Sequence, residues 1–483
     1  MLMSEAKFPD KSKSALSELT STQKKLILVG ISFASFMSPF GMSMLNLSLS
    51  EIGAEFSVSA HALAWISTAY LFSSILFLVP MARISDLVGR KKIFLIGMTL
   101  AFINAMIEPF VPDFWILVLF RALDGFAMSC VFATSLPILS SIYPPSQRGS
   151  VFGINVSVIY LGSTMGPVVG GIVTAHFGWR ILFSLLLPLA ALGIYMVTRY
   201  LKTDVAESKG EPFDKTGTVL YMISIFFLLF GLSNLPKTWA FVLMAIGLLS
   251  LPLFIWHAKN GKYPVMQVKL FFSNKRFTRS NFAAFMNYAG TYAVAFFLSL
   301  YLQRVLNLPA DMAGIVLLAQ PALQAIFSPF VGKLSDKTDS RYLSTLGMLI
   351  LAVGLVGCSA LNSETSLIYL IGCEILLGIG FALFSSPNTS AIMNSVDKRD
   401  YSSASASLSV MRQSGMVLAM AIAMCSISIF LGSTEMLNPE TVPYFLTSMK
   451  TTFYIGTALC LIGAVLSYSR GAAHRPDVAG ETS

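Results

Sequence analysis

The sequence contains few charged residues. Only 12% of its 483 residues are Asp, Glu, Lys or Arg, whereas 55% are hydrophobic. Soluble domains carry about 25% charged residues, so this composition excludes an ordinary soluble protein. The formal net charge of +9 does not indicate a nucleic-acid partner, because Lys and Arg fall between long apolar runs, where they orient helices in a membrane. We expect an integral membrane protein that is in contact with the lipid bilayer and binds no nucleic acid.

Residues that bind metals or form disulfides are scarce as well. The five cysteines lie within apolar segments without a CxxC pair, and the four histidines stand at segment ends or in tails, never together. This arrangement indicates buried thiols rather than ligands or bridges. We therefore expect no metal site and no cofactor.

Motifs of enzymes and of nucleotide-driven pumps are absent from the sequence. It has no HExxH motif, no intramembrane pair of His or Cys, and no Gly-Lys followed by Ser or Thr as a P-loop requires. The chain is predicted not to be an enzyme and not to hydrolyse nucleotides.

Long apolar runs make up most of the chain. The segments that could span a bilayer are centred near residues 36, 72, 101, 126, 162, 189, 226, 247, 292, 321, 350, 378, 418 and 457. Their even number places both termini on one side, and Lys and Arg gather in the even-numbered loops, such as Arg90–Lys92. The positive-inside rule then predicts a multi-pass protein of the cell membrane with both termini in the cytoplasm. The polar N-terminal stretch lacks the features of a secretory signal.

A short charged loop occurs twice, as Arg83-Ile-Ser-Asp86-Leu-Val-Gly89-Arg90 after the second segment and as Gly332-Lys-Leu-Ser-Asp336-Lys-Thr-Asp339-Ser-Arg341 after the tenth. A repeat of this kind indicates two homologous helical bundles. We predict an all-α integral membrane fold of 14 transmembrane helices, in two pseudo-symmetric six-helix bundles with an inserted, peripheral helix pair. The expected divisions are an N-terminal tail, the first bundle, a linker with the inserted pair, a cytoplasmic loop, the second bundle and a C-terminal tail, at residues 1–24, 25–201, 202–258, 259–280, 281–469 and 470–483.

Two further stretches complete a recognisable set of motifs. They are Arg121-Ala-Leu-Asp124-Gly125 and Gly162-Ser-Thr-Met-Gly166-Pro167-Val-Val-Gly170-Gly171. Together with the charged loops they resemble signature motifs of the major facilitator superfamily, and 14 segments resemble its drug:proton antiporter branch. The resemblance implies alternating access without a cofactor, and we expect a monomer. The first loop departs from the family pattern, with Ala82 for a usual Gly and Leu87 for a usual Arg.

The glycines of the fifth segment recur every fourth residue. Gly162, Gly166 and Gly170 form a stripe without side chains, which lets a neighbouring helix approach closely. Pro167 removes one backbone hydrogen bond and bends the helix, while Gly171 extends the stripe. The stretch predicts either a pivot or ordinary membrane-helix packing, and the motif resembles that of antiporters rather than symporters.

Arg121 and Asp124 are charges inside the fourth segment, where they are costly and therefore functional candidates. Their spacing places them on one helix face, where they can neutralise one another. If Arg121 moves away from Asp124, the proton affinity of the Asp124 carboxyl rises, and this coupling suits a proton-driven carrier. The alternative is a static ion pair. The resemblance adds that Asp124 stands where the family usually has Gln, and Gly41 where many members have Asp.

Four polar residues of the second half complete the predicted path. Glu374 corresponds to Arg121 in the repeat and is expected to face it across a central cavity, or to lie near headgroups or pair elsewhere. Arg412 and Gln413 either meet substrate or tie their helix to its neighbours. Asn388, after Pro387, either lines the cavity or hydrogen-bonds a backbone group that the proline leaves without its helical partner. Glu108 is expected to face solvent.

The charged loops are predicted to act as gates. The residues concerned are Asp86, Gly89, Arg90, Gly332, Asp336 and Arg341. Their ion pairs can form in one state and break in another, and the resemblance implies that they latch the outward-open state. The alternative is that Arg90, Lys91 and Lys92 only hold the first loop in the cytoplasm.

The predicted function is proton-coupled efflux of small amphipathic compounds of the multidrug or antibiotic type, with a small-molecule substrate and protons as partners. Two alternatives remain open, a carrier of one specific metabolite and a non-transporting membrane sensor.

Overall fold

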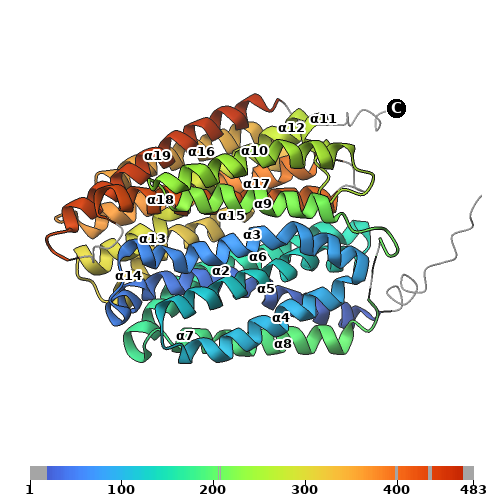
Figure 1. Ribbon diagram of the computed structural model, residues 1–483, viewed down its shortest axis with the longest axis horizontal. Coiled ribbons are helices and arrows are strands. Elements are labelled where there is room, and N and C mark those ends of the chain that lie inside the picture. Colours follow the sequence, from blue (N-terminus) through green and yellow to red (C-terminus); the bar gives the residue numbers. More distant parts are fainter. Residues whose placement is uncertain (1–18, 205, 207, 397–400, 433–437, 472–483) are drawn as a thin grey trace, which may run out of the picture.

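The computed structural model describes residues 19–204, 206, 208–396, 401–432 and 438–471, and these residues contain helices but no β-strand (Figure 1). Fourteen stretches of this part are long and apolar enough to cross a membrane, which confirms the predicted number. The fold class predicted from the sequence is therefore correct.

Six of these stretches form the first half. The elements are α2 (Ser21–Phe56), α3 (Ala60–Val88), α4 (Arg90–Ile107) with the turn η1 (Glu108–Phe110), α5 (Phe114–Ile142), α6 (Pro145–Phe177), and α7 (Ile181–Ser184) with α8 (Leu186–Tyr200).

The inserted pair and the second half follow. The pair is α9 (Lys215–Ser233) and α10 (Thr238–Asn260), and the short α11 (Lys269–Ser273) leads into the second half. That half consists of α12 (Lys275–Thr291) with α13 (Ala293–Leu300) and η2 (Tyr301–Val305), α14 (Ala310–Leu317) with α15 (Ala319–Lys337), α16 (Ser340–Ser359), α17 (Leu367–Met393), α18 (Tyr401–Phe430) and α19 (Val442–Ser469).

Helix starts are set by local hydrogen bonds. Thr20 forms a capping box with Gln23 ahead of α2, and the Asp113 carboxylate caps α5. Asp214 caps α9 and also accepts a 2.8 Å bond from His257 of α10, so one residue joins the linker to both inserted helices. Burial opposes ionisation of Asp214, but the Gly217 amide and His257 outweigh it and hold the pKa of this carboxyl below its usual value.

The two halves repeat the same packing. Helix α3 packs on α5 as α15 packs on α17, and α2 packs on α6 as α12 packs on α18. Gly125 lies against the Tyr70 carbonyl of α3, and its counterpart Gly378 lies against the Gln320 carbonyl of α15, where an added Cβ would come within 2.6 Å. The internal repeat in the sequence therefore corresponds to two bundles of matching architecture.

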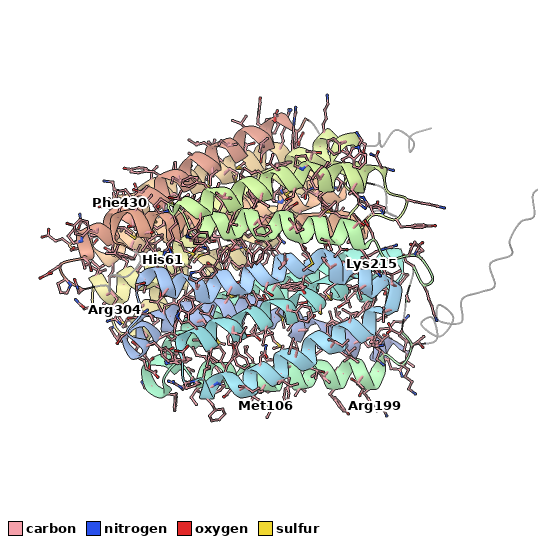
Figure 2. The ribbon with its side chains drawn as sticks, viewed as in Figure 1. His61, Met106, Arg199, Lys215, Arg304 and Phe430 are labelled. Atoms are coloured by element: carbon pink, nitrogen blue, oxygen red, sulfur yellow. The ribbon has the colours of Figure 1, made fainter. Side chains whose placement is uncertain are left out.

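The halves touch mainly at one end of the molecule. We call this the far end, where α2 ends and α19 begins; Figure 2 shows His61, Arg304 and Phe430 there and Arg199 and Lys215 at the opposite, terminal end. His61 approaches the Met424 carbonyl oxygen at 3.3 Å, and Arg304 donates to the Ser50 carbonyl. The described contacts thus join the halves most closely away from the termini.

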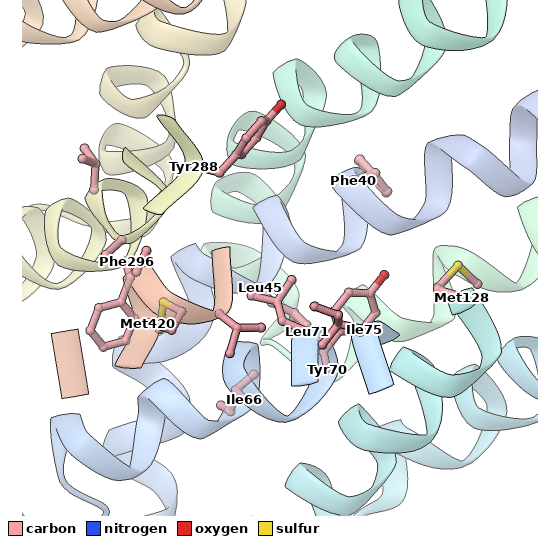
Figure 3. Close-up of a cluster of buried hydrophobic side chains, with 14 of the residues drawn as sticks. Phe40, Leu45, Ile66, Tyr70, Leu71, Ile75, Met128, Tyr288, Phe296 and Met420 are labelled. Carbon is pink, nitrogen blue, oxygen red and sulfur yellow. The ribbon is translucent and has the colours of Figure 1, made fainter. Parts of the chain in front are cut away.

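Apolar side chains from both halves fill the interface further in. Figure 3 shows Leu45 and Leu71 of the first half in one cluster with Phe296 and Met420 of the second. The inserted α9 also reaches this region, because it packs against both α3 and α18 and its Tyr221 hydroxyl donates to the Ile75 carbonyl at 2.7 Å. The inserted pair was predicted as peripheral packing, and one of its helices packs against both halves.

Candidate functional site

A charged cluster lies inside the first half. Arg121 and Asp124 of α5 form a direct ion pair, and the Asn104 amide of α4 donates to the second Asp124 oxygen at 2.9 Å. Glu108 adds a second carboxylate, 3.8 Å from the Arg121 Nε. All four side chains are buried, so two acids share one cation away from water.

Glu108 corrects a prediction. It was expected to face solvent at the end of its helix, but it is 0% exposed. The turn η1 continues α4 as a 3-10 helix and directs Glu108 toward α5 instead of outward. Neither Glu108 oxygen has a hydrogen-bond partner among the described residues.

Aromatic rings hold the Arg121 guanidinium in place. Its carbon lies 5.5 Å from the centre of the Tyr70 ring and 5.6 Å from that of Phe183, both within cation–π distance. The Tyr70 hydroxyl in turn bonds to Ser38 of α2 at 2.5 Å. The cluster is thereby connected to helices α2, α3 and α7.

A small cavity adjoins this cluster. Glu108, Arg121 and Asp124 line it together with Gly41 of α2, and its free volume is about 20 Å³. That volume holds a water molecule but no organic compound.

A second polar cluster joins the two halves. Tyr160 of α6 bonds to Ser385 of α17 at 2.7 Å, and an Arg412 nitrogen of α18 lies 3.4 Å from the same Ser385 oxygen. The Arg412 guanidinium lies 5.3 Å from the centre of the Tyr288 ring of α12. Arg412 therefore lies beside the Tyr160–Ser385 bond that joins the two halves.

Glu374 has partners within its own half. Its carboxyl lies close to the Gln320 backbone amide, at the start of α15, and to Cys358 of α16, while one of its oxygens has no hydrogen-bond partner among the described residues. A free amide at a helix start is a natural partner for a carboxylate. Among the described residues, the contacts of Arg121 belong to the first half, so the two pseudo-symmetric positions have separate surroundings instead of facing one another across a cavity.

Asn388 and Gln413 are both buried. The Asn388 amide donates to the Ser280 carbonyl at 3.0 Å, and its oxygen accepts from Arg470 at 2.8 Å. Burial and nearby Arg276 lower the pKa of Arg470, just after α19, to about 9. Asn388 thus joins helices at the terminal end, while the Gln413 oxygen has no partner among the described residues.

The glycine stripe of α6 packs on two helices. A Cβ added at Gly162 would lie 2.9 Å from the Phe36 carbonyl oxygen of α2, and one at Gly170 would lie 2.5 Å from that of Met44. On the other side, Gly171 approaches the Ala310 carbonyl, and Gly314 of α14 approaches the Pro167 carbonyl. We call this second contact the α6–α14 seam; it lies between the halves, where any added side chain would force them apart.

The first charged loop makes a compact set of contacts. Arg90 pairs with Asp86 at 2.8 Å, and Asp204 of the linker accepts from the Lys91 backbone amide at 2.8 Å. Gly89 has a φ of 130° and touches Asp204, so a side chain there would be both strained and obstructed. The linker also contributes Glu211, which pairs with Arg83 at 2.8 Å.

The second loop differs from the first. Gly332 faces Ser386 of α17, and Arg341 stacks on Tyr342, with its Nε 3.7 Å from Asp339. The Asp336 side chain lies outside the described part of the structure.

The sequence interpretation missed several residues of these sites. Asn104 and Glu108 stand four positions apart in an otherwise apolar segment, which places them on one helix face; this spacing was the available signal. Tyr160, Ser385 and Tyr288 carry no such signal, because only the folded structure brings them to Arg412.

Comparison with known proteins extends these observations. A family model described as Major Facilitator Superfamily matches residues 31–257 and 281–482. The riboflavin transporter RibZ of Clostridioides difficile (strain 630) is 27% identical over 447 residues, covering 92% of this chain and 97% of its own. The lincomycin resistance protein LmrB of Listeria monocytogenes is 24% identical over 452 residues, covering 91% and 95%.

A further relative and two solved structures are also similar. The multidrug resistance protein Stp of Mycobacterium tuberculosis (strain CDC 1551 / Oshkosh) is 25% identical over 415 residues, covering 85% of this chain and 77% of its own. A peptide transporter POT in complex with sulfate superposes with a TM-score of 0.69 at 14% identity, covering 95% of this chain and 99% of its own. A bacterial homolog of the human lysosomal transporter Spinster gives 0.64 at 16% identity, covering 93% and 97%.

Proposed function

Because the chain belongs to the major facilitator superfamily, we propose that it is a secondary transporter that exports small amphipathic compounds in exchange for protons. It acts as a monomer in the cell membrane, with the terminal end in the cytoplasm and the far end outside. In this orientation the described contacts close the protein toward the outside.

The observation that carries the proposal is the sharing of Arg121 by two buried acids. With both acids ionised, the cluster has one uncompensated negative charge within the membrane, which is costly. One bound proton makes the cluster neutral. Asp124 already accepts from Arg121 and Asn104, so Glu108, which lacks a donor, is the better proton carrier.

The α6–α14 seam supports movement of the halves. It joins the halves through backbone contacts at glycine and proline, which can separate without breaking ion pairs. Tyr70 connects this movement to the proton site, because its ring contacts Arg121 while its hydroxyl holds α2. A change in the charge of the cluster thereby alters contacts of the helix that packs against α6.

Relatives named for resistance to drugs or lincomycin support export of varied compounds. A relative named as a riboflavin transporter, similar over almost its whole length, supports a second candidate, a carrier of one metabolite with a flat ring system. The tyrosines Tyr160 and Tyr288 at the interface favour such a ring.

The test uses purified protein in lipid vesicles with an imposed pH gradient and a panel of dyes, antibiotics and riboflavin. We expect gradient-driven movement of several unrelated compounds in the wild type. Glu108→Gln and Asp124→Asn should lose the gradient dependence but retain exchange of compound across the membrane, because an amide binds no proton. Movement of riboflavin alone would establish the second candidate.

The matched control is Glu364→Gln, which makes the same chemical change in an exposed loop and should transport like the wild type. Unchanged gradient dependence in both Glu108→Gln and Asp124→Asn would contradict the assignment of the proton site.

A further inference from the structure

We propose that Arg412 binds an anionic group of the transported compound, so that the substrates include planar aromatic compounds carrying a carboxylate or a similar acidic group. This inference rests on the proposed function as a carrier of small molecules. It assigns a substrate class to the interface between the halves, a site separate from the Arg121 cluster.

The position of the site comes from its four helices. Tyr160 belongs to the first half, and Tyr288, Ser385 and Arg412 belong to three helices of the second. A compound that crosses the membrane by alternating access has to be held between the two halves. Any compound held between α6, α12, α17 and α18 meets these side chains.

The charge of the site is unbalanced. Among the described residues, no carboxylate lies within 4.0 Å of an Arg412 nitrogen, whereas Arg121 has two carboxylates within that distance. The nearest acid along α17, Glu374, precedes Ser385 by eleven positions, or about 16 Å of helix. Arg412 is thus an intramembrane cation in contact with neutral phenol and hydroxyl groups only. Such a cation requires a negative partner, which an incoming anion supplies.

The donors of the site suit an anionic oxygen. A guanidinium presents several N–H donors in a fork that matches a carboxylate, and each nearby hydroxyl can donate one more bond. The Ser385 hydroxyl lies 3.4 Å from an Arg412 nitrogen and bonds to the Tyr160 hydroxyl at 2.7 Å. Among the described residues, Arg412, Ser385 and Tyr160 therefore place donors together without a competing carboxylate.

The aromatic part of the substrate follows from the surroundings. Tyr288 presents its ring to Arg412, and Figure 3 shows Tyr288 and Tyr70 on elements of opposite halves beside the apolar cluster. Flat apolar ring systems pack well on tyrosine faces. Arg412 and Tyr160 are only partly buried, so a compound can still reach them.

The test measures binding of two dyes that share a xanthene ring but differ in charge, anionic fluorescein and cationic rhodamine 6G. Purified protein in detergent is titrated with each dye at neutral pH, and binding is followed by fluorescence anisotropy. We expect the wild type to prefer fluorescein. Arg412→Gln should weaken fluorescein binding on the order of tenfold to a hundredfold, as expected for loss of a charged hydrogen-bonding partner, without weakening rhodamine 6G.

Two further variants separate recognition from structure. Arg412→Lys keeps the charge without the fork and should retain the preference for fluorescein in part. Tyr160→Phe removes the hydroxyl that ties the halves together but keeps the guanidinium, so fluorescein should remain the preferred dye. Comparison of the two dyes on one preparation cancels any loss of folded protein.

The proposal is overturned if fluorescein does not bind the wild type, or if Arg412→Gln leaves the ratio of the two affinities unchanged. In the second case Arg412 only ties helices together. Because the binding assay has no proton gradient, a failure of proton coupling in vesicles does not alter its result.

Discussion

At the scale of residues, three positions on three helices surround the cavity beside Arg121. Gly41 belongs to α2, Glu108 to η1 and Asp124 to α5, yet all three line the same small space. By its resemblance to the superfamily, this chain has Gly41 at a position where many members have an acid. The structure explains how the acid can stand elsewhere, since a carboxylate at any of the three positions borders the same cavity.

This arrangement predicts a rescue. A Cβ at Gly41 would meet only the end of Leu186, at 3.6 Å, so an Asp can be accommodated there. In a Glu108→Gln background, Gly41→Asp should restore gradient-driven transport, because it returns a proton-binding group to the cavity. Transport into vesicles with an imposed pH gradient measures the effect.

Gly41→Asn in the same background is the control, since it adds equal bulk without a titratable group and should leave transport uncoupled. Restoration by both variants would show that volume, rather than proton binding, matters at this position.

The residues of the Arg121 cluster and of the Arg412 site could be predicted only in part. Arg121 and Asp124 were found because their spacing puts them on one helix face. Glu108 was misplaced because the direction of a side chain in a terminal 3-10 turn depends on the last residues of the helix, which periodicity does not determine. The partners of Arg412 come from three other helices, so only tertiary packing reveals them.

At the scale of elements, the α6–α14 seam has no space for side chains. Gly314→Leu should therefore keep the halves apart at the far end and shift the protein toward the state open there, which slows transport. Spin labels at positions 110 and 368, both highly exposed at that end, measure the change as a longer interlabel distance.

Gly372→Leu is the matched control. It introduces the same side chain on α17, where nothing lies within 4 Å of an added Cβ, and should not change the distance. A Gly314→Leu protein with the wild-type distance would show that the seam does not set the closure.

Most helices could be predicted because a membrane span requires about 20 apolar residues in succession. The interruptions within these spans could not be predicted. The segments centred near residues 292 and 321 each contain a break, between α12, α13 and η2 and between α14 and α15. The break before α15 leaves the start of that helix close to Glu374, an acid that symmetry had assigned to Arg121.

At the scale of the whole molecule, the orientation of the bundle makes a direct prediction. Glu364 lies in an exposed loop at the far end and Lys262 in an exposed loop at the terminal end. In intact cells, a membrane-impermeant maleimide should label a Glu364→Cys protein but not a Lys262→Cys protein. Both should react after permeabilisation, and the reverse pattern would place the termini outside.

The position of α9 has a consequence for how compounds dissolved in lipid reach the interface. This helix covers one side of the boundary between the halves, where α3 meets α18. Among the described elements no inserted helix covers the opposite side, where α6 meets α14 and α15. The two sides of an otherwise symmetric molecule are thus unequal, so a compound dissolved in the lipid meets α9 on one side and the helices of the boundary themselves on the other.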